Sequence, residues 1–334
     1  SFISIFRNVS QKSLEYAIPD FEYFELSMSN EADMQCSVDR FSHACSDFGL
    51  TISTKKTEVL HQPAPGREFV QPNILVNGES LKVVDRFTYL GSTLSQNTTI
   101  DNEVNTRIAR ASAAFGRLQS TVWKRRGIGL QTKLNVYRAV ILPTLLYACE
   151  TWTVYQRHAR KLNHFHMTCL RRLLNIRWQD RIPDTEVLAQ SGLSSIHTIL
   201  IQYQLRWAGH VVRMPDDRLP KKIFYGELQN GKRSHGGQNK RFKDTLKVSL
   251  RAFGIDPNSW EMDAQNRSAW RSSLYKGSER YEDDRTAAAV RRRQERKART
   301  LAPRTSQDIN IPCPHCNRTF RAQIGLISHL RNKH

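Results

Sequence analysis

The stretch Cys313–His334, CPHCNRTFRAQIGLISHLRNKH, carries the strongest structural signal in this sequence and has the spacing Cys-x2-Cys-x12-His-x4-His. Two cysteines separated by two residues fit a tight knuckle, and two histidines five residues apart lie near one face of a helix. Together they offer two sulfur and two nitrogen ligands, a set suited to tetrahedral Zn2+. The predicted metal ligands are Cys313, Cys316, His329 and His334. Phe320 and Leu326 are the expected core residues of a ββα zinc finger.

A window of about two dozen residues buries too little apolar surface to fold alone, so zinc is expected to supply much of its folding free energy. Without metal, this tail is expected to be disordered. The alternative is a disordered tail in which this spacing arose by chance. Chance would then have to explain why four ligands and two core side chains all stand at the positions that a zinc finger requires.

The helix of this finger offers few groups that could read bases. The base-reading positions hold Ala322, Gly325 and Ser328, so sequence-specific readout is not expected. The candidates for phosphate contacts are Arg318, Arg321, Arg331 and Lys333. A single finger covers about three base pairs, so it is expected to be an accessory to another binding surface.

The charge of the whole chain favours a polyanionic partner. Its 334 residues include 51 Lys and Arg against 31 Asp and Glu, a formal net charge of +20. RNA or DNA is the first candidate partner. No segment approaches the roughly eighteen apolar residues of a membrane span, so no membrane partner is expected. Four scattered cysteines outside the finger do not form a disulfide framework, which favours a reducing compartment. The chain begins with Ser1 rather than Met, which suggests a fragment.

Hydrophobic periodicity predicts an α+β fold that is mainly α. Residues 1–38 remain unassigned, and a short helix is expected at Asp39–Phe48. Strands are expected around Leu50, Ile52 and Val59, followed by a hairpin of Ile74–Val76 and Leu81–Val84 about the turn Asn77-Gly78. The predicted helices follow at Val104–Leu118, Lys133–Tyr147 with a kink at Pro143, Leu162–Leu173 and Ile196–Val212.

Two basic segments follow this helical region. Gly226–Lys243 is a Gly-rich loop in which Lys232, Arg233, Lys240 and Arg241 could cradle phosphates, and a plain flexible linker is the alternative. It does not match the Walker A pattern. Asp283–Arg299 is predicted to be a helix that is polar all round, which bridges domains, binds nucleic acid or signals nuclear import. Its candidate contacts are Arg291, Arg292, Arg293, Arg296 and Lys297.

Two other patterns are better explained without a functional site. His164, His166, Cys169 and Cys149 could form a second metal site, but the apolar spacing of Leu162–Leu173 explains them as one buried helix face. Tyr281-Glu282-Asp283-Asp284 matches Tyr-x-Asp-Asp, the metal-binding motif of reverse transcriptases. That motif requires a hairpin between apolar strands, whereas this one lies in a polar, helical run.

Several blocks resemble the reverse transcriptases of non-LTR (LINE-type) retrotransposons. Gly49–Glu58 and Phe87–Ser92 are similar to the two palm segments that follow the catalytic hairpin in that family. Leu142–Trp152, Arg206–His210 and the Gly231-Lys232-Arg233 loop resemble the region after the palm. The resemblance runs from about Asp39 to the C-terminus and includes the finger, so the chain is similar to the C-terminal part of such a polymerase.

The resemblance implies a domain order and two residue roles. It implies a remnant palm at 39–100, a helical thumb-like region at 101–225, basic loops and helices at 226–310 and a zinc finger at 311–334. Lys56 matches the palm lysine, and Phe87–Gly91 matches the segment that holds the primer end. The family binds Mg2+ through aspartates ahead of Gly49, and no Tyr-x-Asp-Asp stands there in this chain. No catalytic or cofactor-binding residue is therefore assigned, beyond the zinc ligands.

These observations predict a zinc-binding, nucleic-acid-binding remnant of a reverse transcriptase that grips RNA or DNA mainly through phosphates, independently of sequence. One alternative is the C-terminal part of an active RNA-directed DNA polymerase whose front half is missing from this sequence. Another is a protein-interaction adaptor that uses the finger and its residue Ile324. The basic cluster and the habits of the family favour the nucleus over the cytoplasm, and the oligomeric state stays open.

Overall fold

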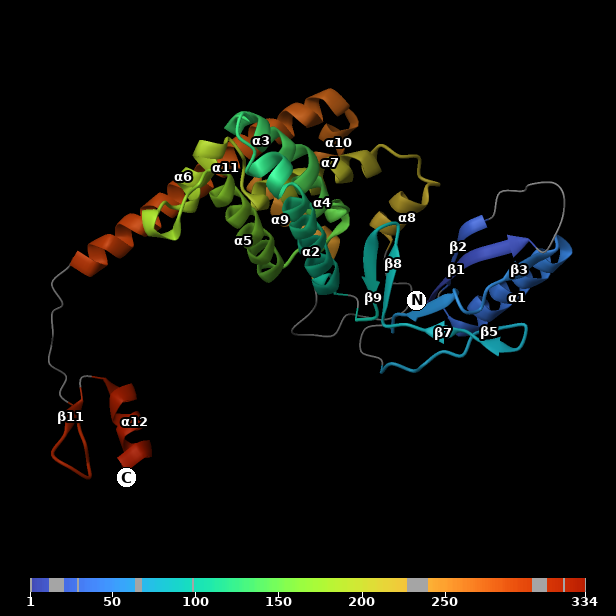
Figure 1. Cartoon of the computed structure of the whole chain (residues 1–334), viewed down its shortest axis with the longest axis horizontal. Coiled ribbons are helices and arrows are strands. Elements are labelled where there is room, and N and C mark those ends of the chain that lie inside the picture. The colour runs from blue at the N-terminus through green and yellow to red at the C-terminus, as the bar shows by residue number, and fades with distance from the viewer. Residues whose placement is uncertain are drawn as a thin grey trace. The chain divides into compact units, whose positions relative to one another are not determined.

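The computed structural model describes residues 2–11, 21–28, 30–63, 68–97, 99–226, 240–301, 311–320 and 322–333 (Figure 1). The chain divides into two compact units, Ser1–Glu282 and Asp283–His334. Helices dominate both units and the strands form small sheets, so the predicted α+β, mainly α fold is confirmed. No helix in the described part of the chain has the length and apolarity needed to cross a membrane.

The first unit begins with strands and continues with helices. Its strands are β1 (Phe2–Gln11), β2 (Phe21–Met28), β3 (Leu50–Ile52), β4 (Glu58–His61), β5 (Leu75–Val76), β6 (Glu79–Ser80), β7 (Lys82–Val83), β8 (Arg86–Tyr89) and β9 (Ser92–Ser95). Its α-helices are α1 (Glu31–Asp47), α2 (Asp101–Arg117), α3 (Leu130–Val136), α4 (Leu142–Leu145), α5 (Gln156–Leu173), α6 (Asp184–Ser191), α7 (Ile196–Val212), α8 (Leu219–Tyr225), α9 (Phe242–Ala252) and α10 (Trp260–Gln265). Helix α11 (Arg267–Leu301) starts in this unit and continues into the second.

A sheet of order β2-β1-β4-β7, with β3 also paired to β1, forms the N-terminal part of the first unit. β1 runs antiparallel to β2, β3 and β4, and β7 runs parallel to β4. Met34 and Val38 of α1 are fully buried in one cluster with Val59 and Ile74. Full burial of each such side chain contributes about 1.5–3 kcal/mol to stability.

The structure adds to the predicted N-terminal elements. Residues 1–38, left unassigned from the sequence, contain β1, β2 and the start of α1. The helix expected from Asp39 begins at Glu31, because the Asn30 side chain accepts a hydrogen bond from the Asp33 amide and caps it. Neither β1 nor β2 contains an aspartate, so this hairpin carries no Tyr-x-Asp-Asp motif.

The predicted hairpin at Asn77-Gly78 is confirmed, but its second strand was misplaced. Asn77 and Gly78 have φ angles of 51° and 84°, the left-handed values that a tight hairpin turn requires. The turn joins β5 to β6 at Glu79–Ser80. Residues 81–84, expected to form that second strand, instead supply β7, which pairs with β4.

A helical core fills the middle of the first unit. Helices α2 to α7 share one buried cluster that includes Val104, Tyr137, Leu145, Leu170 and Leu200. The helices predicted at Val104–Leu118, Leu162–Leu173 and Ile196–Val212 are present as α2, α5 and α7. The helix predicted at Lys133–Tyr147 is broken by a wider π-helical turn, η2 (Tyr137–Ile141), ahead of Pro143, which stands in the first turn of α4.

A second buried cluster joins the end of α7 to helices α8 to α11. Trp270 of α11 packs on Gly209 of α7, where an added Cβ would lie 2.3 Å from the indole nitrogen. Only glycine leaves room for this contact. The indole N–H of Trp270 also donates a hydrogen bond to the Leu205 carbonyl at 3.2 Å.

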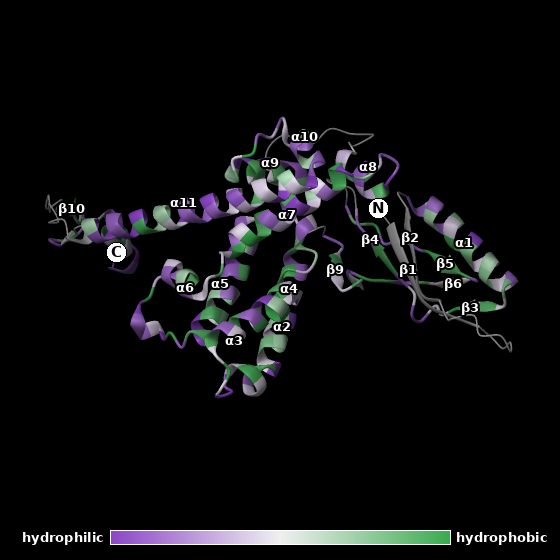
Figure 2. Ribbon diagram, turned by 90° about the horizontal axis from the view of Figure 1, so that it is seen from above, coloured by the Kyte–Doolittle hydropathy of each residue, from purple (hydrophilic) through white to green (hydrophobic). Residues whose placement is uncertain are grey.

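Helix α11 is longer than the predicted Asp283–Arg299 because its first turns bury Trp270 and Leu274. Figure 2 shows mostly hydrophilic residues along this helix. The segment Tyr281–Asp284 is helical, which confirms that it is not a catalytic hairpin. The Glu282 carboxylate instead accepts hydrogen bonds from the hydroxyls of Ser195 and Thr198 at the start of α7.

Of the residues considered for a second metal site, Cys149, His166 and Cys169 lie in the helical core and His164 is exposed. His166 is fully buried, and its Nδ1 lies 2.8 Å from the hydroxyl oxygen of Tyr137. Burial lowers the pKa of His166 from 6.5 to about 4 and raises the pKa of the Cys169 thiol from 9.0 to about 12. In the described part of the chain, these side chains form no cluster of three metal-ligating atoms.

His166 is expected to make the stability of the first unit depend on pH. The unfolded chain binds the His166 proton below about pH 6.5, whereas the folded chain binds it only below about pH 4. The contribution of neutral His166 to the free energy of unfolding is therefore fully present above pH 6.5. It falls by up to about 3 kcal/mol as the pH drops to 4. Urea unfolding of the wild type and of His166→Gln should differ in pH dependence within this window. Parallel curves for the two proteins would contradict the assignment.

Candidate metal centre and nucleic-acid interface

The second unit ends in a small ββα arrangement. Strands β10 (Ile311–Pro312) and β11 (Thr319–Phe320) pair antiparallel, and helix α12 (Gln323–Lys333) follows. The turn between the strands is closed by a hydrogen bond from the Cys313 amide to the Arg318 carbonyl at 2.8 Å. This knuckle places both cysteines beside the helix.

Three of the four predicted metal ligands come together. The ligand atoms of Cys313, Cys316 and His329 all lie within 4.8 Å of one another, and the Cys316 Sγ is 3.2 Å from the His329 Nε2. His334 lies outside the described residues. Two thiols and an imidazole at these separations are a donor set that fits Zn2+.

The surroundings of Cys313 favour a thiolate. Burial acts to raise the pKa of this thiol, but hydrogen bonds from the His315 amide and from Cys316 outweigh it and hold the pKa below its ordinary value. The His315 N–H lies 3.4 Å from the Cys313 Sγ. Since thiolates bind zinc, this arrangement suits the metal.

Side-chain packing in this unit is slight. Phe320 and Leu326, the predicted core residues, are only half-buried, and α12 buries no residue fully. The Phe320 ring lies 4.9 Å from the His329 ring, between centroids. Ile324 is 79% exposed, which leaves its side chain open to a partner as the adaptor hypothesis requires.

The predicted phosphate contacts are spread over several elements. Lys56 is exposed in the turn between β3 and β4. Lys232, Arg233 and Arg321 lie outside the described residues. The exposed members of the set on α11 and in the ββα arrangement are Arg291, Arg292, Arg293, Arg296, Lys297, Arg318, Arg331 and Lys333.

Lys240 and Arg241 have partners within the first unit. The Lys240 amide donates to the Tyr155 hydroxyl at 3.0 Å, and its ammonium lies 5.8 Å from the centre of that ring. Arg241 precedes α9, where its amide donates to the Asp244 carboxylate and its guanidinium lies 3.6 Å from the same group. Arg241 is thus partly neutralised, which weakens its case as a phosphate contact.

The block Phe87–Ser92 forms the hairpin of β8 and β9, and the helical core holds its turn. Leu90 and Gly91 have φ angles of 45° and 85°. The Arg110 guanidinium donates to the Gly91 carbonyl at 2.7 Å, and the Tyr147 hydroxyl donates to the Leu90 carbonyl at 2.9 Å. Two of the recognised blocks, Phe87–Ser92 and Leu142–Trp152, therefore meet in space.

Arg107 connects this turn to α2. Its guanidinium donates to the Gly91 carbonyl and forms a buried ion pair with Glu103 at 2.7 Å. The same guanidinium lies 4.4 Å from the centre of the Tyr147 ring. The second carboxylate oxygen of Glu103 accepts the Thr93 amide at 2.6 Å.

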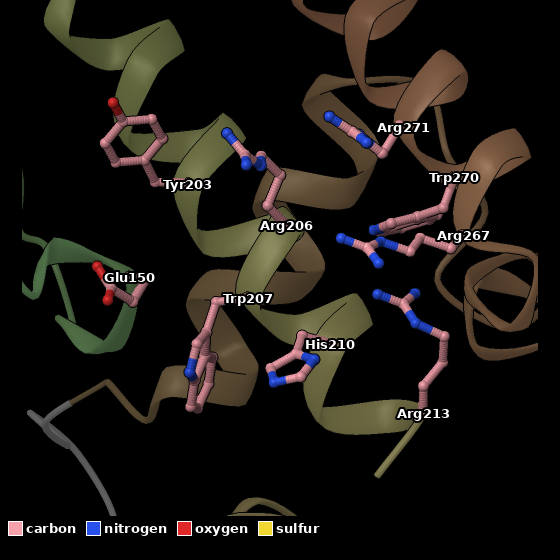
Figure 3. Close-up of a pocket in the computed structure, with 9 residues that line it drawn as sticks. All are labelled: Glu150, Tyr203, Arg206, Trp207, His210, Arg213, Arg267, Trp270 and Arg271. Carbon is pink, nitrogen blue, oxygen red and sulfur yellow. The ribbon is translucent and has the colours of Figure 1, made fainter.

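The first unit also contains a basic pocket that no sequence pattern predicted (Figure 3). This arginine pocket has a volume of about 490 Å³ and is lined by Glu150, Tyr203, Arg206, Trp207, His210, Arg213, Arg267, Trp270 and Arg271. The block Arg206–His210 was recognised, but α11 supplies Arg267 and Arg271 from far along the chain. The packing of Trp270 on Gly209 helps to bring the two sets together.

Comparison with known proteins shows similarity to proteins of mobile elements. It is 27% identical over 233 residues to an uncharacterized transposon-derived protein of Caenorhabditis elegans, which covers 68% of this chain and 83% of that protein. The chain is related to retrotransposon proteins. It is also 23% identical over 154 residues to the RNA-directed DNA polymerase from mobile element jockey of Drosophila melanogaster, and 22% identical over 116 residues to that of Drosophila funebris.

These alignments cover the chain and its relatives unequally. They include 46% and 34% of this chain but only 17% and 13% of the two jockey polymerases, so the chain matches a small part of those proteins. No family model matches the chain. These distant similarities confirm the predicted relationship to a reverse transcriptase. They do not bear on the ββα arrangement at the C-terminal end.

Proposed function

We propose that this chain is a zinc-binding, nucleic-acid-binding protein derived from a retrotransposon reverse transcriptase. It binds RNA or DNA mainly through phosphates, independently of sequence, and it does not polymerise. The observation that carries this proposal is the exposure of the α11 cations Arg291, Arg292, Arg293, Arg296 and Lys297 on a chain with a net charge of +20. Arg291 lies 4.0 Å from Glu295, and this ion pair joins two exposed side chains, so it offsets little of that charge.

The zinc part of the proposal rests on the ligand set at the C-terminus. Cys313, Cys316 and His329 would bind the ion with His334 as the fourth ligand. Bound zinc would supply the cross-link that a unit with so little packing needs. The finger would add phosphate contacts through Arg318 and Arg331, and the nucleus is the compartment that fits such binding.

Salt dependence tests the nucleic-acid part. Each phosphate neutralised by a lysine or arginine releases counterions, so contact with about six phosphates should weaken binding on the order of a thousandfold between 50 and 200 mM salt. Fluorescence anisotropy with a labelled RNA hairpin and a DNA duplex measures this slope. Affinity that stays flat over this range, or no binding at low salt, would refute the proposal.

A second candidate function is that of the C-terminal part of an active polymerase. The similarity to the jockey polymerases over 154 residues favours it. A longer transcript with an in-frame Tyr-x-Asp-Asp hairpin ahead of these residues would support this candidate. Primer extension by the encoded longer protein, lost when those aspartates are changed, would establish it.

A further inference from the structure

The arginine pocket lies between α7, the start of α11 and the short helix η3 (Cys149–Thr151), all within the first unit. Arg206 and His210 come from α7, Arg213 directly follows that helix, and Arg267 and Arg271 come from successive turns of α11. Figure 3 shows the guanidinium groups of Arg213, Arg267 and Arg271 turned toward the middle of the pocket and that of Arg206 turned toward the Tyr203 side. Its volume of about 490 Å³ falls within the ~300–1,000 Å³ of known ligand pockets.

The charge of this pocket is not balanced from within. Glu150 is its one carboxylate against four arginines, and no arginine of the pocket forms an ion pair in the described part of the chain. Arg213 is half-buried, and its guanidinium donates to the Ala264 carbonyl, which fixes its position near Arg267. Like charges held together without a counterion favour binding of an anion. Guanidinium groups match phosphate oxygens with paired hydrogen bonds.

Aromatic rings complete the lining. Trp207 is half-buried, and the rings of Phe224 and Phe242 lie at 68° and 88° to it at centroid distances of 6.1 and 5.5 Å. Their edge-on packing holds the indole in place. Tyr203 lies one turn before it on α7. Fixed aromatic faces beside phosphate-binding groups allow unpaired bases to stack, as in proteins that bind single strands.

We propose that the arginine pocket binds the phosphodiester backbone of single-stranded nucleic acid, with a base against Trp207. A flexible strand can bend into a hollow of this size and turn its bases toward aromatic rings, whereas a duplex keeps its bases stacked inside a stiff cylinder. This inference rests on the proposed nucleic-acid binding. It locates a principal site in the first unit, which includes neither the exposed α11 cations at 291–297 nor the ββα arrangement.

The test compares two double variants of the full chain that remove equal charge. Arg267→Gln/Arg271→Gln removes exposed arginines of the pocket, and Arg125→Gln/Arg126→Gln removes exposed arginines of the same unit outside it. Binding of 12-nucleotide single-stranded RNA, single-stranded DNA of the same sequence and the corresponding DNA duplex is measured at three salt concentrations. Thermal unfolding checks that both variants fold as the wild type does.

The pocket variant is expected to bind single strands at least about tenfold more weakly and to lose about 1.4 from the salt slope, the value for two phosphate contacts on a single strand. The control variant should lose less than about threefold. The RNA and DNA arms show which backbone the pocket prefers. Equal losses in both variants, or a larger loss with duplex than with single strands, would overturn the inference while salt-dependent wild-type binding still upheld the proposed function. Absence of wild-type binding would overturn both.

Discussion

Replacement of Arg107 by methionine is expected to lower the free energy of unfolding of the first unit by about 3–5 kcal/mol. Both side chains of the Glu103–Arg107 pair are 4% exposed, and their charged atoms lie 2.7 Å apart. The substitution leaves the Glu103 carboxylate buried without its counter-charge. It also removes the guanidinium that donates to the Gly91 carbonyl and packs on Tyr147. Urea unfolding followed by circular dichroism measures the loss.

Arg110→Met is the matched control for this prediction. Arg110 lies on the same helix and donates to the same Gly91 carbonyl at 2.7 Å, but it is exposed and has no buried carboxylate beside it. Its loss is expected to cost less than about 1 kcal/mol. The double variant Glu103→Gln/Arg107→Met should recover part of the stability lost in the single variant, because no buried charge remains unpaired. Equal costs for the two single variants would show that the ion pair has no special role.

Much of the helical part of the fold could be predicted because apolar residues recur there at helical spacing. Both ends of α7 were predicted correctly, because Ser195 and Arg213 bound its apolar run. The N-terminal strands were not, because residues 1–30 show no clear period and β1 pairs with β3 and β4, far along the chain, as well as with β2. The end of the Asn77-Gly78 hairpin was misplaced for the same reason, since pairing with β4 draws residues 82 and 83 away from it.

The site was predicted only where its residues are close in sequence. Cys313 and Cys316 stand in a short spacing pattern, and the structure brings them to His329 as the pattern requires. The arginine pocket has no such pattern, because Arg206 and Arg267 meet through the contact of Trp270 with Gly209. Charge runs on exposed helices were visible in the sequence, but a concave cluster of the same charge depends on tertiary packing.

Removal of zinc is expected to unfold residues 311–333 and to leave the first unit intact. Zinc-finger peptides gain about 10–16 kcal/mol of apparent binding free energy from the metal, and α12 buries no residue that could replace this contribution. Hydrogen exchange with mass spectrometry of the full chain, with and without a chelator, measures the effect. Amides of α12 should exchange rapidly after chelation, while those of α5 and α7 keep their protection.

Substitutions distinguish a metal centre from a chance cluster of thiols and imidazoles. Native mass spectrometry should find one zinc ion per wild-type chain and none for Cys313→Ser, whereas Cys36→Ser, at an exposed cysteine outside the cluster, should retain the ion. His334→Asn tests the fourth ligand and should weaken zinc binding without changing the first unit. Protection of α12 that is the same with and without chelator would mean that the ββα arrangement is stable through packing alone. The phosphate contacts of Arg318 and Arg331 would then persist without metal, and chelation would leave nucleic-acid affinity unchanged.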